Sequence, residues 1–152
     1  MNERTDSIVL HFIAQYLMAP FILLFGFYVL VFGESGPGGG FQAGAIVGSA
    51  LVLMRLTEGM EQSRRFLSSR GLLLIACAGV GIYAGVGLLA LFAGQPFLDY
   101  SYVPNGWVNA FAEREHTSRA LGVLGIEIGV FLAVAATLTL IFDYLMERLS
   151  DA

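Results

Sequence analysis

One acid and one histidine stand within long uncharged stretches of this sequence, Glu127 and His11. Glu127 follows Arg119 by eight residues, which places it about 12 Å along a helix that rises 1.5 Å per residue. A carboxylate at that depth in a membrane is costly unless it is protonated, paired or facing water, so Glu127 is a candidate for an ion pathway. The alternative is a protonated acid that hydrogen-bonds a neighbour for assembly. His11 is either a proton-relay candidate or an interfacial histidine with a hydrated partner.

The run from Gly36 to Gly44 reads Gly-Pro-Gly-Gly-Gly-Phe-Gln-Ala-Gly and links two long apolar segments. The proline ends the first segment, and the glycines permit a positive φ and close approach of another backbone. Free N–H groups at the start of the following helix favour a negative partner, such as a carboxylate or an ion with its shell, although a tight turn between closely packed helices is the alternative. The candidate residues of this turn are Pro37, Gly38, Gly39, Gly40, Phe41 and Gly44.

The composition is that of a membrane protein. Charged residues make up 13% of the 152 residues and hydrophobic residues 57%, whereas soluble domains carry roughly 25% charged residues. The net charge of −4 argues against a nucleic-acid partner, and the single cysteine, Cys77, excludes an internal disulfide. Glu113 to His116 places three potential metal ligands close together, but consecutive residues without a second histidine or cysteine nearby favour a solvated helix start. We therefore expect no metal and no cofactor.

Four long apolar segments predict an all-α membrane protein with one domain over residues 1–152. Pro20 should kink the first helix. Arg55 is expected to extend its side chain to the membrane interface, and Asp143 to mark the surface where the last helix leaves the membrane. The predicted transmembrane helices are residues 8–32, 41–59, 71–94 and 119–143.

Glycines recur at intervals of four residues in several of these helices, a spacing that lets a neighbouring helix approach closely. The first series begins at Gly40 and Gly44, and a pair flanks Glu127 on a different face from the carboxylate. The other glycines predicted to pack against helices are Gly48, Gly81, Gly85, Gly125 and Gly129.

The distribution of arginine predicts the orientation. Both termini and the loop between the second and third helices share one side of the predicted membrane, and the other two loops share the opposite side. Because cytoplasmic loops are enriched in basic residues, both termini should be cytoplasmic and the glycine turn should face outward. The arginines on the cytoplasmic side would be Arg4, Arg55, Arg64, Arg65, Arg70 and Arg148.

The glycine turn, together with Gly125-Ile126-Glu127-Ile128-Gly129-Val130 in the last helix, resembles the MnhB/MrpB family over nearly the whole chain. These are the B subunits of Mrp-type multisubunit Na+/H+ antiporters. The resemblance implies a secondary-transporter subunit rather than an enzyme, located in the bacterial plasma membrane and assembled with other antiporter subunits. Na+ and H+ would be the transported ions, and Glu127 would border their pathway.

Three other functions remain open at this stage. The same type of subunit could serve a membrane-bound respiratory hydrogenase complex, and nothing in the sequence separates that function from the first. A small autonomous four-helix proton-coupled exporter would need only one membrane carboxylate, but such exporters are shorter and carry the acid in the first helix. A scaffold subunit would have no residue in the ion pathway.

Overall fold

The computed structural model describes residues 9, 11–33, 38–59, 63–64, 67–92, 94–99 and 116–150, without the side chains of 116–119 and 121. In these residues every regular element is a helix: the π-helix η1 (Ile13–Met18), α2 (Ala19–Val31), α3 (Gly40–Glu58), α5 (Ser69–Phe92) and α7 (His116–Ser150). The segments long and apolar enough to cross a membrane are Ile13–Val31, Gly40–Glu58, Ser69–Phe92 and Gly122–Ser150. This confirms the prediction of an all-α protein with four such helices.

The ends of the helices differ from the predicted ones mainly in α7. We predicted an end at residue 143, where charged residues begin to appear, but α7 continues to Ser150. Its last turns include Leu145, Met146 and Glu147, which are strong helix formers. A charged residue marks where an apolar stretch ends, but it does not have to end the helix.

The first membrane helix is irregular one turn before Pro20. Residues Ile13–Met18 are π-helical, and the N–H of Ala19 donates to the carbonyl of Ala14, five residues earlier. Pro20 then stands in the first turn of α2, where its missing N–H costs little. The backbone therefore adjusts to the proline within η1.

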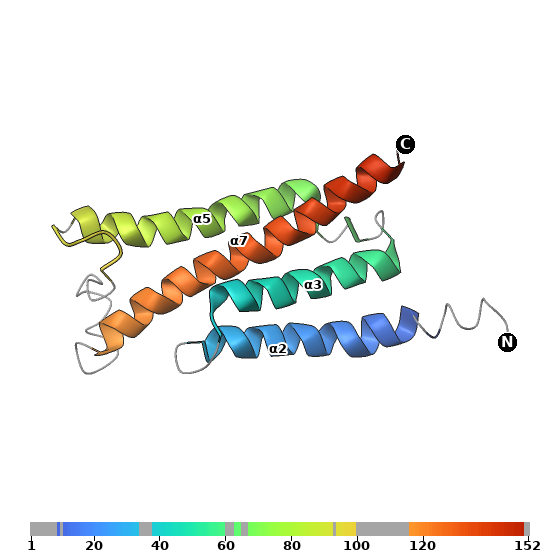
Figure 1. Cartoon of the computed structure of the whole chain (residues 1–152), viewed down its shortest axis with the longest axis horizontal. Helices are drawn as coiled ribbons and strands as arrows, with labels where there is room; N and C mark the ends of the chain where they lie inside the picture. The colour runs from blue at the N-terminus through green and yellow to red at the C-terminus, as the bar shows by residue number, and fades with distance from the viewer. Residues whose placement is uncertain are drawn as a thin grey trace.

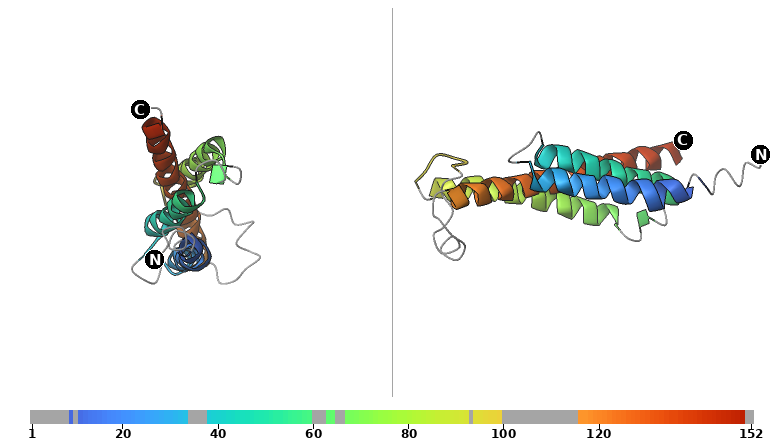
Figure 2. Two further views of the ribbon diagram at one scale, coloured as in Figure 1. Left: turned by 90° about the vertical axis from the view of Figure 1, so that its right-hand side faces the viewer. Right: turned by 90° about the horizontal axis from the view of Figure 1, so that it is seen from below.

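The helices lie in one row in the order α2, α3, α7 and α5 (Figures 1 and 2). α3 packs between α2 and α7, and α7 packs between α3 and α5. One end of the row, which we call the termini end, holds the start of η1, the end of α3, the start of α5 and the end of α7. The opposite end, where α2 ends and α3 begins, is called the turn end. α3 and α7 are consequently parallel.

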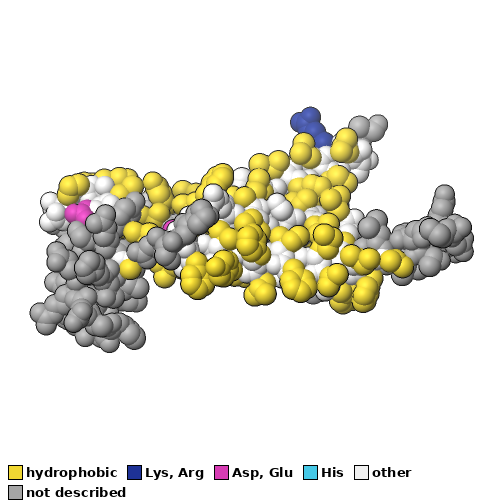
Figure 3. Space-filling model, turned by 60° about the horizontal axis from the view of Figure 1, so that its bottom comes forward, with side chains coloured by type: hydrophobic (Ala, Val, Ile, Leu, Met, Phe, Trp, Pro, Cys, Tyr) yellow, Lys and Arg dark blue, Asp and Glu magenta, His cyan; other side chains and the backbone are white. Residues whose placement is uncertain are grey.

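Two hydrophobic clusters hold the row together, and α7 contributes to both. The first joins α2, α3 and α7, and the second joins α5 and α7. Elsewhere large apolar side chains are exposed along the helices, and the face in Figure 3 is predominantly hydrophobic. The surface is thus suited to lipid or to other apolar helices. The buried residues are Leu30, Ala43, Val47, Phe131 and Ala135 in the first cluster, and Leu72, Ala136 and Leu140 in the second.

Glycines set the close spacing between α3 and α7. A Cβ on Gly44 would lie 2.8 Å from the carbonyl oxygen of Phe131, and one on Gly48 would lie 3.2 Å from the side chain of Leu138. Distances this short are below ordinary van der Waals contact, so a larger residue would push the helices apart. α3 therefore packs its glycine face directly on the backbone of α7.

The glycines of α5 divide into two groups. A Cβ on Gly79 would lie 2.5 Å from the carbonyl oxygen of Gly129, so these two residues set the spacing of α5 and α7. Gly125 of α7 is packed less closely, because the atom nearest to a Cβ on it belongs to Val86 of α5 and lies 3.7 Å away. At Gly81 and Gly85, a Cβ would meet no described atom within 4 Å. Their predicted packing role involves no described helix of this chain and stays a prediction.

Candidate functional site

The start of α3 requires glycine at two consecutive positions. Gly39, the residue before the helix, has φ 153° and ψ −176°, a region that is essentially restricted to glycine. Gly40 is buried, and a Cβ there would overlap the carbonyl oxygen of Glu127 and lie 2.8 Å from its Cα. The start of α3 is therefore seated on the backbone of α7 at Glu127.

The carboxyl group of Glu127 lies beside the same helix start. Its Oε1 is 3.3 Å from the position that a Cβ on Gly39 would occupy, and the side chain is partly buried. The first N–H groups of a helix lack partners within that helix, and they carry the positive end of its dipole. Because a negative charge is favoured at this position, the start of α3 and Glu127 form one candidate site.

The two sequence motifs therefore meet in space. From the sequence we expected the helix start after the glycines to favour a carboxylate, but nothing in it indicated that Glu127 would supply one. The contact depends on the packing of α3 against α7, because the glycines stand at the start of α3 and Glu127 lies within α7.

His11 lies at the other end of the row. It comes one turn before Gln15, whose side-chain amide donates to Oε1 of Glu58 at the end of α3. Glu127 lies beside the start of α3. The start and the end of α3, Gly40 and Glu58, are 18 residues and therefore about 27 Å apart. The structure therefore does not bring the two predicted ion-path residues together.

A buried ion pair at the termini end was not predicted. The Nε of Arg55 is 3.0 Å from Oδ1 of Asp143, and the two side chains are only 2% and 0% exposed. Nη2 of Arg55 also donates to the carbonyl of Leu67 at 2.8 Å, and the Ser69 hydroxyl donates to Oδ2 of Asp143 at 3.3 Å. The expectations that Arg55 reaches the interface and that Asp143 marks the surface were wrong, because each charge is neutralised inside the protein.

One sequence signal could have indicated this pair. Arg55 follows Gly40 by 15 residues, and Asp143 follows Glu127 by 16 residues. Two parallel helices in contact at Gly40 and Glu127 therefore bring Arg55 and Asp143 to the same level. Opposite charges at matched positions in two apolar segments are typical of pairing inside a membrane protein.

No metal site is evident. The described residues hold no group of three or more histidine, cysteine, aspartate or glutamate side chains that could bind an ion. Of the segment from Glu113 to His116, only the helical backbone at His116 is described. The prediction of a solvated helix start lies otherwise outside the described residues.

Comparison with known proteins identifies the family. A family model described as "Domain related to MnhB subunit of Na+/H+ antiporter" matches residues 9–140, most of the chain. The chain belongs to the MnhB family. Relatives named "Putative antiporter subunit mnhB2" from Staphylococcus aureus strains Newman, JH1 and COL are each 33% identical over 142 residues, which cover 90% of this chain and 96% of the relative. The resemblance stated from the glycine turn and the Glu127 motif is confirmed.

The MnhB match includes the whole candidate site at Glu127 and the start of α3. Arg55 also lies inside the matched residues, whereas Asp143 lies just beyond them. The MnhB region thus carries one partner of the buried pair, and the extension of α7 supplies the other.

Proposed function

We propose that this MnhB-family chain is a small membrane subunit of a multisubunit Na+/H+ antiporter, in which it supports assembly and borders an ion pathway at Glu127. The match to the MnhB family and the names of the relatives support the antiporter subunit. We place it in a bacterial plasma membrane as a multi-pass protein with both termini in the cytoplasm, an orientation supported by the positions of the arginines.

The observation that carries the role of Glu127 is its contact with the start of α3. The first N–H groups of a helix and the positive end of its dipole favour a negative partner beside them. Such a site can exchange a proton or accept a cation when the carboxylate also faces other subunits. Since the described helices form a row, a pathway at Glu127 would be completed by residues of neighbouring subunits.

Glu127→Gln tests this role, because it keeps the shape and hydrogen bonding of the side chain and removes its charge. We expect Na+/H+ exchange per assembled complex in everted vesicles to fall at least tenfold, with normal recovery of the complex. Glu127→Asp, which retains the charge on a shorter side chain, should keep part of the exchange. Glu147→Gln is the control, because Glu147 is an acid of the same helix with a side chain 53% exposed.

The outcomes separate the alternatives. Wild-type exchange in Glu127→Gln would refute the pathway role, and a loss of complex with normal exchange per remaining complex would indicate a scaffold subunit. Purification of the tagged chain in mild detergent, followed by mass spectrometry, tests the host complex. Large antiporter-type subunits would support the proposal, metal-bearing hydrogenase subunits would refute it, and a homo-oligomer alone would indicate an autonomous exporter.

A further inference from the structure

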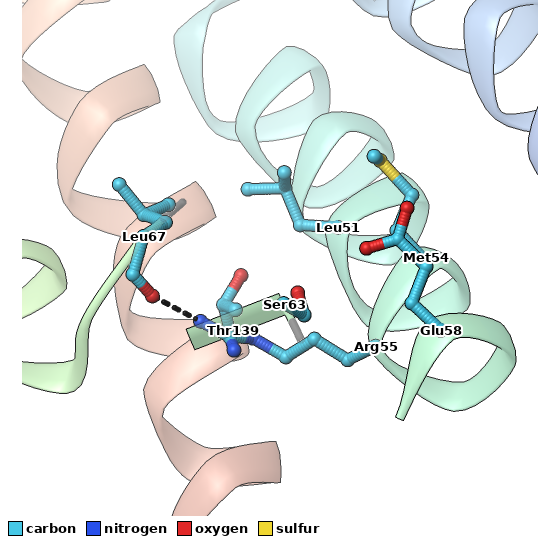
Figure 4. Close-up of a pocket in the computed structure, with 7 residues that line it drawn as sticks. All are labelled: Leu51, Met54, Arg55, Glu58, Ser63, Leu67 and Thr139. Atoms are coloured by element: carbon cyan, nitrogen blue, oxygen red, sulfur yellow. Dashed lines mark hydrogen bonds between the residues drawn. The ribbon is translucent and has the colours of Figure 1, made fainter. Parts of the chain in front are cut away.

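A cavity of about 190 Å³ lies at the termini end, between α3, α7 and the segment that leads into α5 (Figure 4). It is partly open to the outside of the helix row, and Leu51, Met54 and Leu67 line its apolar parts. An apolar cavity of about 150 Å³ inside a protein can bind a molecule as large as benzene, so this one has room for part of a lipid chain. The proposed ion pathway at Glu127, beside the start of α3, does not use it.

Two of the polar side chains on the cavity wall are engaged within the protein. Arg55 is paired with Asp143 and donates to a backbone carbonyl, and the hydroxyl of Thr139 donates to the carbonyl of the residue four positions earlier. With these groups engaged, the wall is mainly apolar and also carries Glu58 and Ser63. Small-molecule sites commonly have this composition, in which a few polar groups orient a largely apolar ligand.

The polarity of the cavity wall changes along α3 as the polarity of a membrane changes with depth. α3 has 19 residues and is about 28 Å long, close to the thickness of about 30 Å of a hydrocarbon core. Its last turn, with Glu58, therefore reaches the level where hydrocarbon meets the lipid headgroups. Leu51 stands seven residues before Glu58 and so lies about 10 Å deeper. The cavity is thus apolar at depth and polar at the headgroup level, as a phospholipid is.

The charges at the headgroup level select the kind of phospholipid. Glu58 accepts a hydrogen bond from the neutral amide of Gln15 and forms no ion pair with the described basic side chains. Arg64, which follows Ser63 on the cavity wall, is 33% exposed and lies 3.4 Å from Glu147. A carboxylate and a guanidinium at this level match a headgroup that carries both an ammonium and a phosphate. Anionic lipids are instead bound by basic pockets.

We propose that this cavity binds one acyl chain of a phospholipid whose headgroup carries an ammonium, such as phosphatidylethanolamine. The acyl chain lies against Leu51 and Met54, the ammonium meets the carboxylate of Glu58, and the phosphate meets the guanidinium of Arg64. The lipid fills the space between α3 and α7 at the termini end and so becomes part of the folded subunit. This binding does not depend on the role of Glu127 or on the transported cation.

Photocrosslinking with two matched lipids tests the proposal. The intact complex is placed in nanodiscs that contain phosphatidylethanolamine or phosphatidylglycerol, each with a diazirine at the same position of one acyl chain, and mass spectrometry locates the labelled residues. Met54 of the cavity is compared with Leu74, which is 71% exposed on α5 and stands at a similar distance from the termini end. We expect the ratio of Met54 to Leu74 labelling to be at least fivefold higher with phosphatidylethanolamine.

Two outcomes would overturn the proposal. Labelling of Leu74 without labelling of Met54 would indicate that another part of the protein or another subunit fills the cavity. Equal ratios with the two lipids would show that the headgroup is not recognised.

Variants of the wall test the two ends of the lipid separately. Glu58→Gln keeps an acceptor for Gln15 and removes the charge, so it should lower the ratio with phosphatidylethanolamine to that with phosphatidylglycerol. Leu51→Phe adds a ring at the wall and should lower Met54 labelling at least fivefold, whereas Leu51→Ile conserves the volume and should keep the wild-type labelling. If Leu51→Phe does not assemble, Glu58→Gln decides, because its side chain is only partly buried. An unchanged ratio in Glu58→Gln would contradict the proposal.

Discussion

The Arg55–Asp143 pair shows how single residues determine the register of two helices. Both side chains are almost completely buried. Arg55 donates to the carbonyl of Leu67, just before α5, and Asp143 accepts from the hydroxyl of Ser69, the first residue of α5. Removing charges from water is expensive, so such a pair is a weak source of net stability but a strong constraint on geometry. A substitution that neutralises one partner leaves the charge of the other uncompensated.

We therefore expect Asp143→Asn to destabilise the subunit by about 3–5 kcal/mol, because Arg55 stays charged in a buried site. Thermal unfolding of the purified subunit, followed by circular dichroism, measures the effect. Glu147→Gln is the matched control, since the Arg64–Glu147 pair is exposed (33% and 53%) and should contribute no more than about 1 kcal/mol.

The double variant Arg55→Met/Asp143→Leu removes both charges and replaces them with apolar groups. It should be more stable than Asp143→Asn, because neither variant side chain leaves a charge unpaired. Equal melting temperatures for Asp143→Asn and the Glu147→Gln control would show that the pair does not carry this constraint.

At the scale of residues, the sequence identified several important residues, but it did not identify the residues that they contact. The glycines from Gly38 to Gly40 and the acid at Glu127 were recognised from their unusual chemistry. Their contact and the Arg55–Asp143 pair were not, because each joins residues of different helices. Such contacts follow from the order and direction of helix packing, which a periodic pattern does not contain.

At the scale of elements, two glycine faces have different environments. Gly44 of α3 lies against the carbonyl of Phe131, whereas Gly81 of α5 has no described atom within reach of a Cβ. A glycine in the interior of a helix costs about 1 kcal/mol relative to alanine. A glycine face that has this cost and no contact among the described residues is suited to a helix from another subunit.

The same substitution at both positions tests this difference. Gly44→Leu should destabilise the isolated subunit, because overpacking of a tight contact typically costs about 1–3 kcal/mol. Gly81→Leu should leave the melting temperature of the isolated subunit nearly unchanged and lower the recovery of partner subunits in a pull-down several-fold. Normal recovery with Gly81→Leu would mean that this face contacts lipid.

The helices themselves could be predicted from the sequence, because four long uncharged stretches have few other stable structures in a membrane. The π-helical turn before Pro20 and the extension of α7 to Ser150 could not. Hydropathy identifies apolar stretches. It does not report the hydrogen-bond register of a helix or how far the helix continues past its apolar stretch.

At the scale of the whole molecule, the row places both described chain ends on one side. The start of η1 and the end of α7 lie at the termini end (Figure 1). Four described arginines lie at this end: Arg55, Arg64, Arg70 and Arg148. Arg119 lies near the start of α7, at the opposite end. By the positive-inside rule, we expect this end to face the cytoplasm.

Cysteine labelling tests this orientation. In a Cys77→Ser background, Ser150→Cys should react with a membrane-impermeant maleimide in everted vesicles and not in right-side-out vesicles. Gln95→Cys is the matched control, because Gln95 is exposed just beyond α5 at the turn end, and it should show the opposite pattern. The reverse result would invert the topology and place Glu127 nearer the cytoplasmic side.

The α3–α7 pair is pinned at both of its ends, by Gly40 on Glu127 and by Arg55 on Asp143, with Gly44 seated between them. These contacts resist both sliding of one helix along the other and separation of the two helices. α5 contacts α7 closely through Gly79 and Gly129, and α2 contacts α3 closely through Gly26, where a Cβ would lie 2.6 Å from the side chain of Val47. The π-helical turn of η1 is a place where a change of hydrogen-bond register can occur. A working cycle that moves this subunit would then move α2, α3, α5 and α7 together as one rigid unit.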